Sequence, residues 1–200
     1  MIHVFLKRIL DIAGASLGLL AISPFVPLIA AAILWESPGP VLVKLSRVSK
    51  GKVIKVYKFR SMMHGAHAMK PTLAHLNERR DGPFFKIKND PRLTRSGKVL
   101  RKFRIDEFPQ LVNVLTGELA LVGPRPHEPE EVIHYPSEHQ HLLLAKAGVT
   151  GLSQVNGASS LPFLRELELD SRYVRNPSLL ADLKIIGKTV AIVFSDPTAV

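Results

Sequence analysis

Residues 19–35 read LLAISPFVPLIAAAILW, an apolar stretch with two prolines at its centre. The uncharged run extends from Ile12 to Trp35. As a straight helix it would be about 36 Å long, enough to cross a hydrocarbon core of roughly 30 Å. Pro24 cannot donate a backbone hydrogen bond and its ring displaces the preceding turn, so a helix should kink there. The stretch therefore predicts a membrane helix that is broken in its middle.

Basic residues flank the apolar run on both sides. Lys7 and Arg8 precede it, and four further lysines and arginines follow within residues 44–52. Because positive residues tend to remain on the cytoplasmic side, both ends are expected there. A re-entrant helix hairpin over residues 1–36, broken at Ser23-Pro24, meets this requirement, and the serine hydroxyl can bond a backbone carbonyl that the break leaves free. A plain membrane-spanning anchor is the alternative.

Charge is distributed unevenly along the 200-residue chain, which has a formal net charge of +10. Residues 44–104 contain eighteen Lys and Arg against three acids, while the remainder of the chain is net −5. A basic block of this size suits an anionic partner, which would be a phosphorylated substrate, a lipid head group or a nucleic acid. The chain has no cysteine, which excludes disulfides, thiolate catalysis and zinc fingers.

Residues 37–200 are predicted to form one catalytic domain, mainly α-helical with a small β-hairpin, an α+β fold. Alternating apolar and basic residues on either side of Lys50-Gly51 predict the hairpin. The last two predicted helices have apolar faces that can pack on the core or lie in the lipid head-group layer. The predicted helices span 64–79, 94–104 (with Thr94 as N-cap), 105–116 (closed by Gly117), 129–143, 161–175 and 178–194.

The densest group of residues suited to catalysis is LRKFRIDEFPQL, residues 100–111. Asp106 and Glu107 are the only acids in this basic run, and Pro109 restricts them to the beginning of a helix. One interpretation is that Asp106 caps that helix. The other is that Asp106 is a carboxylate nucleophile beside a metal-binding Glu107, with Arg101 and Lys102 neutralising phosphate charge.

Four blocks of the sequence resemble one protein family. YKFRSM, LRKFRIDEFPQLVNVLTGELALVGPRP, GVTGLSQVNG and DLKIIGKT are similar, in order and spacing, to the bacterial sugar transferases, the monotopic phosphoglycosyl transferases. The resemblance covers essentially the whole chain. It implies transfer of a sugar 1-phosphate from a UDP-sugar to a polyprenyl phosphate, usually undecaprenyl phosphate, with release of UMP. It also implies a re-entrant helix broken at Ser23-Pro24 and a place on the cytoplasmic face of the bacterial inner membrane, and it leaves homo-oligomerisation open.

The resemblance also assigns roles to individual residues. Asp106 matches the family's nucleophile, which forms a covalent phosphosugar–aspartyl intermediate. Glu107 matches the partner acid that binds Mg²⁺. The remaining matches form the predicted phosphate-binding set, Lys58, Arg101, Arg125 and Asp182, of which Asp182 has no defined role.

The sequence departs from the family pattern in two loops. The turn at Ser49-Lys50 is one residue short and lacks a glycine, and Ala158 stands where an arginine is common. No motif specifies the sugar or the pathway. Two other classes explain parts of the chain: a non-enzymatic, membrane-anchored scaffold and a nucleic-acid-binding protein. No nucleic-acid recognition motif is present, so no nucleic-acid partner is expected, and neither class explains the Asp106-Glu107 pair.

Overall fold

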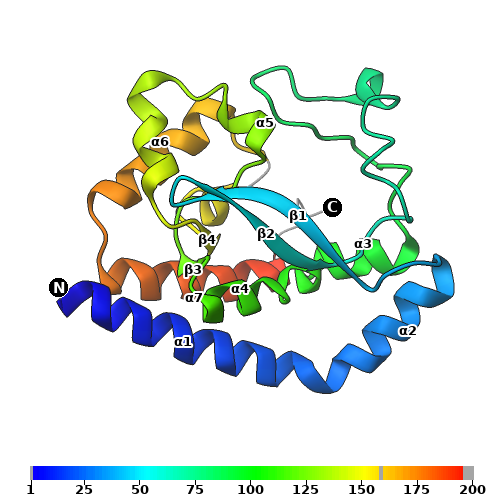
Figure 1. Cartoon of the computed structure of the whole chain (residues 1–200), viewed down its shortest axis with the longest axis horizontal. Helices are drawn as coiled ribbons and strands as arrows, with labels where there is room; N and C mark the ends of the chain where they lie inside the picture. The colour runs from blue at the N-terminus through cyan, green and yellow to red at the C-terminus, as the bar shows by residue number, and fades with distance from the viewer. Residues whose placement is uncertain (1, 158–159, 196–200) are drawn as a thin grey trace.

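The computed structural model describes residues 2–157 and 160–195, which are mostly helical and contain two two-stranded sheets (Figure 1). The predicted mainly helical fold with a small hairpin is confirmed, and the second sheet is an addition to it. The helices are α1 (Ile2–Ile22), α2 (Val26–Glu36), α3 (Arg95–Lys102), α4 (Gln110–Thr116), α5 (Pro129–Val132), α6 (Phe163–Arg175) and α7 (Leu179–Ser195). The strands are β1 (Leu42–Ser49), β2 (Lys52–Phe59), β3 (Ala120–Val122) and β4 (Gly148–Thr150).

The broken apolar helix is the first element of the chain. A 3₁₀ turn, η1 (Ser23–Phe25), joins α1 to α2, and the two helices form an open V along one side of the domain (Figure 1). Pro24 has no N–H to donate to the Leu20 carbonyl, and the Ser23 hydroxyl donates to that oxygen instead, at 2.9 Å. The predicted break is confirmed. The two arms diverge from the bend, however, and do not pack side by side as a hairpin would.

The two arms of the V cover the domain with one face and leave the other uncovered. Ala15, Ile29 and Ile33 are buried in the core. Val4–Glu36 is long and apolar enough to cross a membrane by length and composition, and only 11% of its most apolar window is buried. A core helix would be mostly buried, so this helix has apolar surface that the domain does not cover. Within residues 17–36, the large apolar side chains that are exposed are Leu17, Leu20, Phe25, Leu28, Leu34 and Trp35.

The predicted hairpin is formed by β1 and β2, which pair antiparallel from Leu42↔Phe59 to Ser49↔Lys52. Lys50 and Gly51 have φ of 51° and 69°, the positive values that a two-residue type I′ turn requires. The short loop is thus a regular hairpin turn. The hairpin packs on α4, since Val56 shares a core cluster with Leu111 and Val114.

The ends of α3 and α4 follow the local sequence. The Thr94 hydroxyl accepts a hydrogen bond from the Gly97 amide at 3.0 Å, as an N-cap does. Gly117 ends α4 with φ 84°, a left-handed conformation that favours glycine. Next to α4, β3 and β4 pair in parallel, with Ala120 opposite Gly148.

Two predicted helices are wrong. Residues 64–79 form turns with one 3₁₀ turn, η2 (Ala74–Leu76), because Gly65 adopts φ 77° and Pro71 interrupts the pattern. The range 129–143 is divided into α5 and the 3₁₀ segment η4 (Ser137–Leu144), and Pro136 lies at the break between them.

Candidate active site

Asp106 and Glu107 lie on a tight turn between α3 and α4. Arg104 adopts φ 53°, and the chain then forms one 3₁₀ turn, η3 (Ile105–Glu107). A left-handed non-glycine residue is strained and persists only where the surroundings hold it, as is common at functional sites. Pro109 is the N-cap of α4, and no side chain caps that helix. The capping interpretation of Asp106 is therefore not supported by the geometry.

Lys58 on β2 links the two acids. Its Nζ donates to Glu107 Oε1 at 2.5 Å and lies 3.9 Å from Asp106 Oδ2. The Asp106 side chain is 8% exposed, whereas that of Glu107 is 29% exposed. Lys58 of the hairpin thus forms ion pairs with two carboxylates of η3, one buried and one partly exposed to solvent.

The environment moves the pKa values of the two acids in opposite directions. Burial raises the pKa of Asp106, Lys58 opposes this shift, and the adjacent charge of Glu107 adds to it. Burial would also raise the pKa of Glu107, but the charge and hydrogen bond of Lys58, together with Arg125, hold it below the usual value. Glu107 is therefore the well-stabilised anion, and Asp106 is the more basic carboxylate, which is the property that a nucleophile needs.

Arg101 comes from α3. Its Nε donates to the Ser61 hydroxyl at 3.0 Å, which fixes the side chain just after the end of β2. Its charge lowers the pKa of Asp106, so the guanidinium lies within electrostatic range of that carboxylate. Ser61 lies in the YKFRSM block but is not among the predicted site residues, because its burial and its contact with Arg101 depend on the tertiary structure.

Arg125 reaches the site from the loop that follows β3. Its backbone N–H donates to Asp170 Oδ2 at 2.9 Å, and its guanidinium Nη1 lies 3.5 Å from Glu166 Oε2. The side chain is 36% exposed and interacts electrostatically with Glu107. The structure therefore brings together five of the predicted residues around one turn: Lys58, Arg101, Asp106, Glu107 and Arg125.

Asp182 lies elsewhere. It is fully buried on α7, where its Oδ2 pairs with Lys7 Nζ at 2.9 Å and its Oδ1 accepts from the Tyr173 hydroxyl at 2.6 Å. Lys7 also donates to the Val122 carbonyl at 3.0 Å. These contacts join α1 to the domain, so the position of Asp182 is that of a structural partner and not of a phosphate ligand. Ala158 lies outside the described residues.

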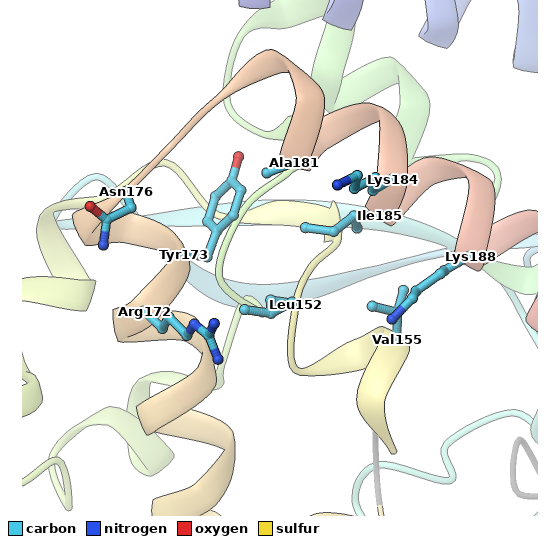
Figure 2. Close-up of a pocket in the computed structure, with 9 residues that line it drawn as sticks. All are labelled: Leu152, Val155, Arg172, Tyr173, Asn176, Ala181, Lys184, Ile185 and Lys188. Carbon is cyan, nitrogen blue, oxygen red and sulfur yellow. The ribbon is translucent and has the colours of Figure 1, made fainter.

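A hollow between α6 and α7 is also separate from the acids. A cavity of about 470 Å³ opens between these helices (Figure 2). It shares no lining residue with the cluster around Asp106. The lining consists of Leu152, Val155, Arg172, Tyr173, Asn176, Ala181, Lys184, Ile185 and Lys188.

Sequence comparisons place this geometry in context. A family model described as bacterial sugar transferase matches residues 2–196. The galactosyl transferase CpsE of Streptococcus agalactiae serotype III (strain NEM316) is 39% identical over 193 residues, which is 96% of this chain and 42% of CpsE. The UDP-glucose:undecaprenyl-phosphate glucose-1-phosphate transferase of Klebsiella pneumoniae is 40% identical over 94% of this chain and 40% of its own length.

A third relative is nearer in length. The exopolysaccharide production protein ExoY of Rhizobium meliloti (strain 1021) is 37% identical over 94% of this chain and 84% of its own. The chain thus spans about two fifths of the two longer relatives and most of the shorter one.

Proposed function

Because the chain belongs to the bacterial sugar transferase family, we propose that it transfers a sugar 1-phosphate from a UDP-sugar to undecaprenyl phosphate. The observation that carries the proposal is the buried Asp106 carboxylate beside Glu107. The charges of Lys58 and Arg101 act on Asp106, and those of Lys58 and Arg125 act on Glu107. A diphosphate carries at least two negative charges, so an anionic nucleophile can approach it only where cations offset the repulsion. Lys58, Arg101 and Arg125 supply those cations.

In the first step, an Asp106 carboxylate oxygen attacks the β-phosphorus of the nucleotide sugar. The bond between this phosphorus and the bridging oxygen breaks, and the electron pair leaves with UMP. The product is a phosphosugar held on Asp106 as an acyl phosphate. The raised pKa of Asp106 supports this role, since a more basic carboxylate is a better nucleophile once ionised.

In the second step, a phosphate oxygen of undecaprenyl phosphate attacks the same phosphorus. The bond to Asp106 breaks, which regenerates the carboxylate and forms a diphosphate between lipid and sugar. Arg101 from α3 and Arg125 from the loop after β3 would neutralise the acceptor phosphate as well as the donor.

The residue types at this site fit a magnesium ion. Mg²⁺ is commonly held by one or two carboxylates together with substrate phosphates. Glu107, which is ionised and partly exposed, would hold the ion. Within residues 2–157 and 160–195, no group of three His, Asp or Glu side chains could hold a metal unaided, so phosphate oxygens would complete the shell. The bound ion would supply positive charge against the diphosphate.

The attachment of the apolar helix supports a re-entrant arrangement in the membrane. Lys7 ties α1 to Asp182, and at the other end Glu36 Oε2 accepts from the Ser96 amide and hydroxyl, both at 2.8 Å. Both ends are therefore attached to one folded domain, which cannot lie on two sides of a bilayer. We propose that the V dips into the cytoplasmic leaflet and that the basic domain remains on the cytoplasmic face.

Cysteine labelling tests this topology, since the chain has no natural cysteine. His3→Cys and Lys50→Cys should both be shielded from a membrane-impermeant thiol reagent applied from the periplasm. Labelling at position 3 without labelling at position 50 would show that the helix spans the membrane and would contradict the proposed arrangement.

Single-turnover measurements test the proposed reaction. The protein with Mg²⁺ and UDP-glucose, UDP-galactose or UDP-N-acetylgalactosamine should release one UMP per active site before any lipid is added. Intact-protein mass spectrometry should find the phosphosugar on residue 106. Asp106→Asn should abolish both signals yet remain folded, because the amide removes a charge that burial disfavours. UMP release at the wild-type rate by this variant would refute the mechanism, and no release from any donor would favour a scaffold.

A further inference from the structure

A buried polar chain lies behind Arg125. Glu166 on α6 is 1% exposed, and its Oε1 lies 2.6 Å from His127 Nε2. The other ring nitrogen of His127 lies 2.5 Å from the Tyr135 hydroxyl. A neutral imidazole satisfies both contacts if the tyrosine donates to Nδ1 and Nε2–H donates to the carboxylate. His127 therefore occupies one oxygen of Glu166 and holds the carboxylate in place.

The second oxygen of Glu166 faces Arg125. Oε2 is buried and has no hydrogen-bond partner in the described part of the chain, and the Arg125 Nη1 lies 3.5 Å away. A buried carboxylate is costly unless a cation compensates it. Burial alone would raise the pKa of Glu166, but Arg125 and His127 hold it below the usual value, so the side chain is an anion in the folded protein.

Four acids favour the charged form of Arg125: Glu166 has the largest effect, followed by Glu107, Glu131 and Asp170. Without the Glu166 carboxylate, the guanidinium would be drawn to Glu107, where it would compete with Lys58 and with a metal ion for the same oxygens. Glu166 therefore influences the position of the partly exposed Arg125 guanidinium.

We propose that Glu166, oriented by His127, is a positioning residue that keeps the Arg125 guanidinium away from Glu107 and available to the diphosphate of the nucleotide sugar. The inference rests on the proposed function, since it assigns Arg125 to the substrate phosphates. It goes beyond that function because Glu166 is not among the residues assigned to the attack or to the substrate phosphates. No feature of the sequence marks it, since Glu166 and Glu168 look alike on the predicted helix.

A double-mutant cycle separates positioning from packing. Glu166→Gln keeps the size and the bond from His127 but removes the charge, and Arg125→Lys keeps a cation without the guanidinium. Glu166→Gln should lower kcat/KM for the UDP-sugar by about 10- to 100-fold, mainly through KM. In the Arg125→Lys background the same change should cost less than about twofold, because the group it positions is gone.

Glu168→Gln is the matched control. Glu168 lies on the same helix, is 54% exposed and pairs with Arg165 at 2.8 Å, so its loss should leave kcat/KM unchanged. Glu166→Asp, which keeps the charge, should recover most of the activity and serves if the glutamine variant does not fold.

Calorimetric titration of UDP provides a readout without turnover. The affinity for UDP should be lower in Glu166→Gln than in the wild type. The double variant should bind UDP as well as Arg125→Lys alone does. Equal losses in both backgrounds, or a lower melting temperature with unchanged affinity and KM, would overturn the inference. If the wild type binds UDP but shows no transfer with any donor, the proposed reaction fails while this cycle still decides the role of Glu166.

Discussion

Replacing Lys7 by methionine tests whether Asp182 is a structural partner or a phosphate ligand. Methionine keeps most of the volume of the lysine stem but removes the ammonium. The change leaves the Asp182 carboxylate fully buried, with a hydrogen bond from the Tyr173 hydroxyl but no cation beside it. It also removes the lysine that donates to the Val122 carbonyl at 3.0 Å. The anchoring of α1 on the domain should therefore weaken.

The magnitude follows from the burial of the pair. Removing one partner of a buried ion pair costs about 3–5 kcal/mol, because the other charge stays uncompensated. The Lys7 side chain is 20% exposed and water can partly replace it, so the lower end, about 3 kcal/mol, is expected. For a chain of this length that corresponds to a fall in melting temperature of about 6–12 °C.

Adding Asp182→Asn to Lys7→Met removes the stranded charge and should recover more than half of the loss. Circular dichroism in detergent measures the melting temperature, and UMP release well below it measures catalysis, which should stay within about threefold of wild type. A melting temperature unchanged in Lys7→Met would refute the reasoning. So would an Asp182→Asn protein of normal stability whose KM for the UDP-sugar rises strongly, since Asp182 would then belong to the phosphate site.

Three further outcomes are expected. Lys58→Gln should lower kcat/KM for the UDP-sugar by about 10- to 100-fold, because both carboxylates lose their shared cation. UMP release measures this change. A normal rate would show that Lys58 takes no part in the reaction. Burial raises the pKa of Asp170 to about 6, so its stabilising protonated form is fully present below pH 4 and is lost as the pH rises through 6. Asp170→Asn should therefore gain stability relative to wild type between pH 4 and pH 8, by on the order of 3 kcal/mol, and a difference in melting temperature independent of pH would contradict this. Gly97→Ala would place a methyl group 1.8 Å from the Ser61 carbonyl oxygen and should lower the free energy of unfolding by about 3 kcal/mol or more. Gly187→Ala is the control, since its methyl group would meet no atom within 4 Å and should be tolerated. Similar melting temperatures for the two variants would show that α3 is less tightly packed than described.

Local signals in the sequence predicted the elements whose ends depend on one residue. Thr94 and Gly117 mark helix ends because their own side chain or backbone makes the cap, and Lys50-Gly51 makes the hairpin turn by itself. The helix predicted over 64–79 is absent, because Gly65 adopts a left-handed conformation and Pro71 interrupts the range. The parallel pairing of β3 with β4 joins three-residue strands far apart in the chain, and no local pattern encodes such a contact.

In the candidate site, too, the residues with a local sequence signal are predictable and those defined by tertiary contacts are not. Asp106 and Glu107 are evident from the sequence as isolated acids in a basic run, and the family resemblance adds the cations around them. The partner of Arg125 is not evident, because Glu166 differs from its exposed neighbour Glu168 only by burial, which depends on the tertiary structure. Asp182 was grouped with the phosphate ligands for the complementary reason, since its pairing with Lys7 connects residues from the two ends of the chain.

The attachment of the bent apolar helix at Lys7 and at Glu36 restricts how the protein could enter a membrane in the proposed topology. A segment closed onto a folded domain at both ends cannot be threaded through a translocation pore, since the domain would have to follow one end. On the proposed topology it must enter sideways from one surface, after or together with folding. Such an insertion enlarges the area of one leaflet and leaves the opposite leaflet unchanged. The protein should therefore bind best where the facing leaflet is loosely packed, as on strongly curved vesicles.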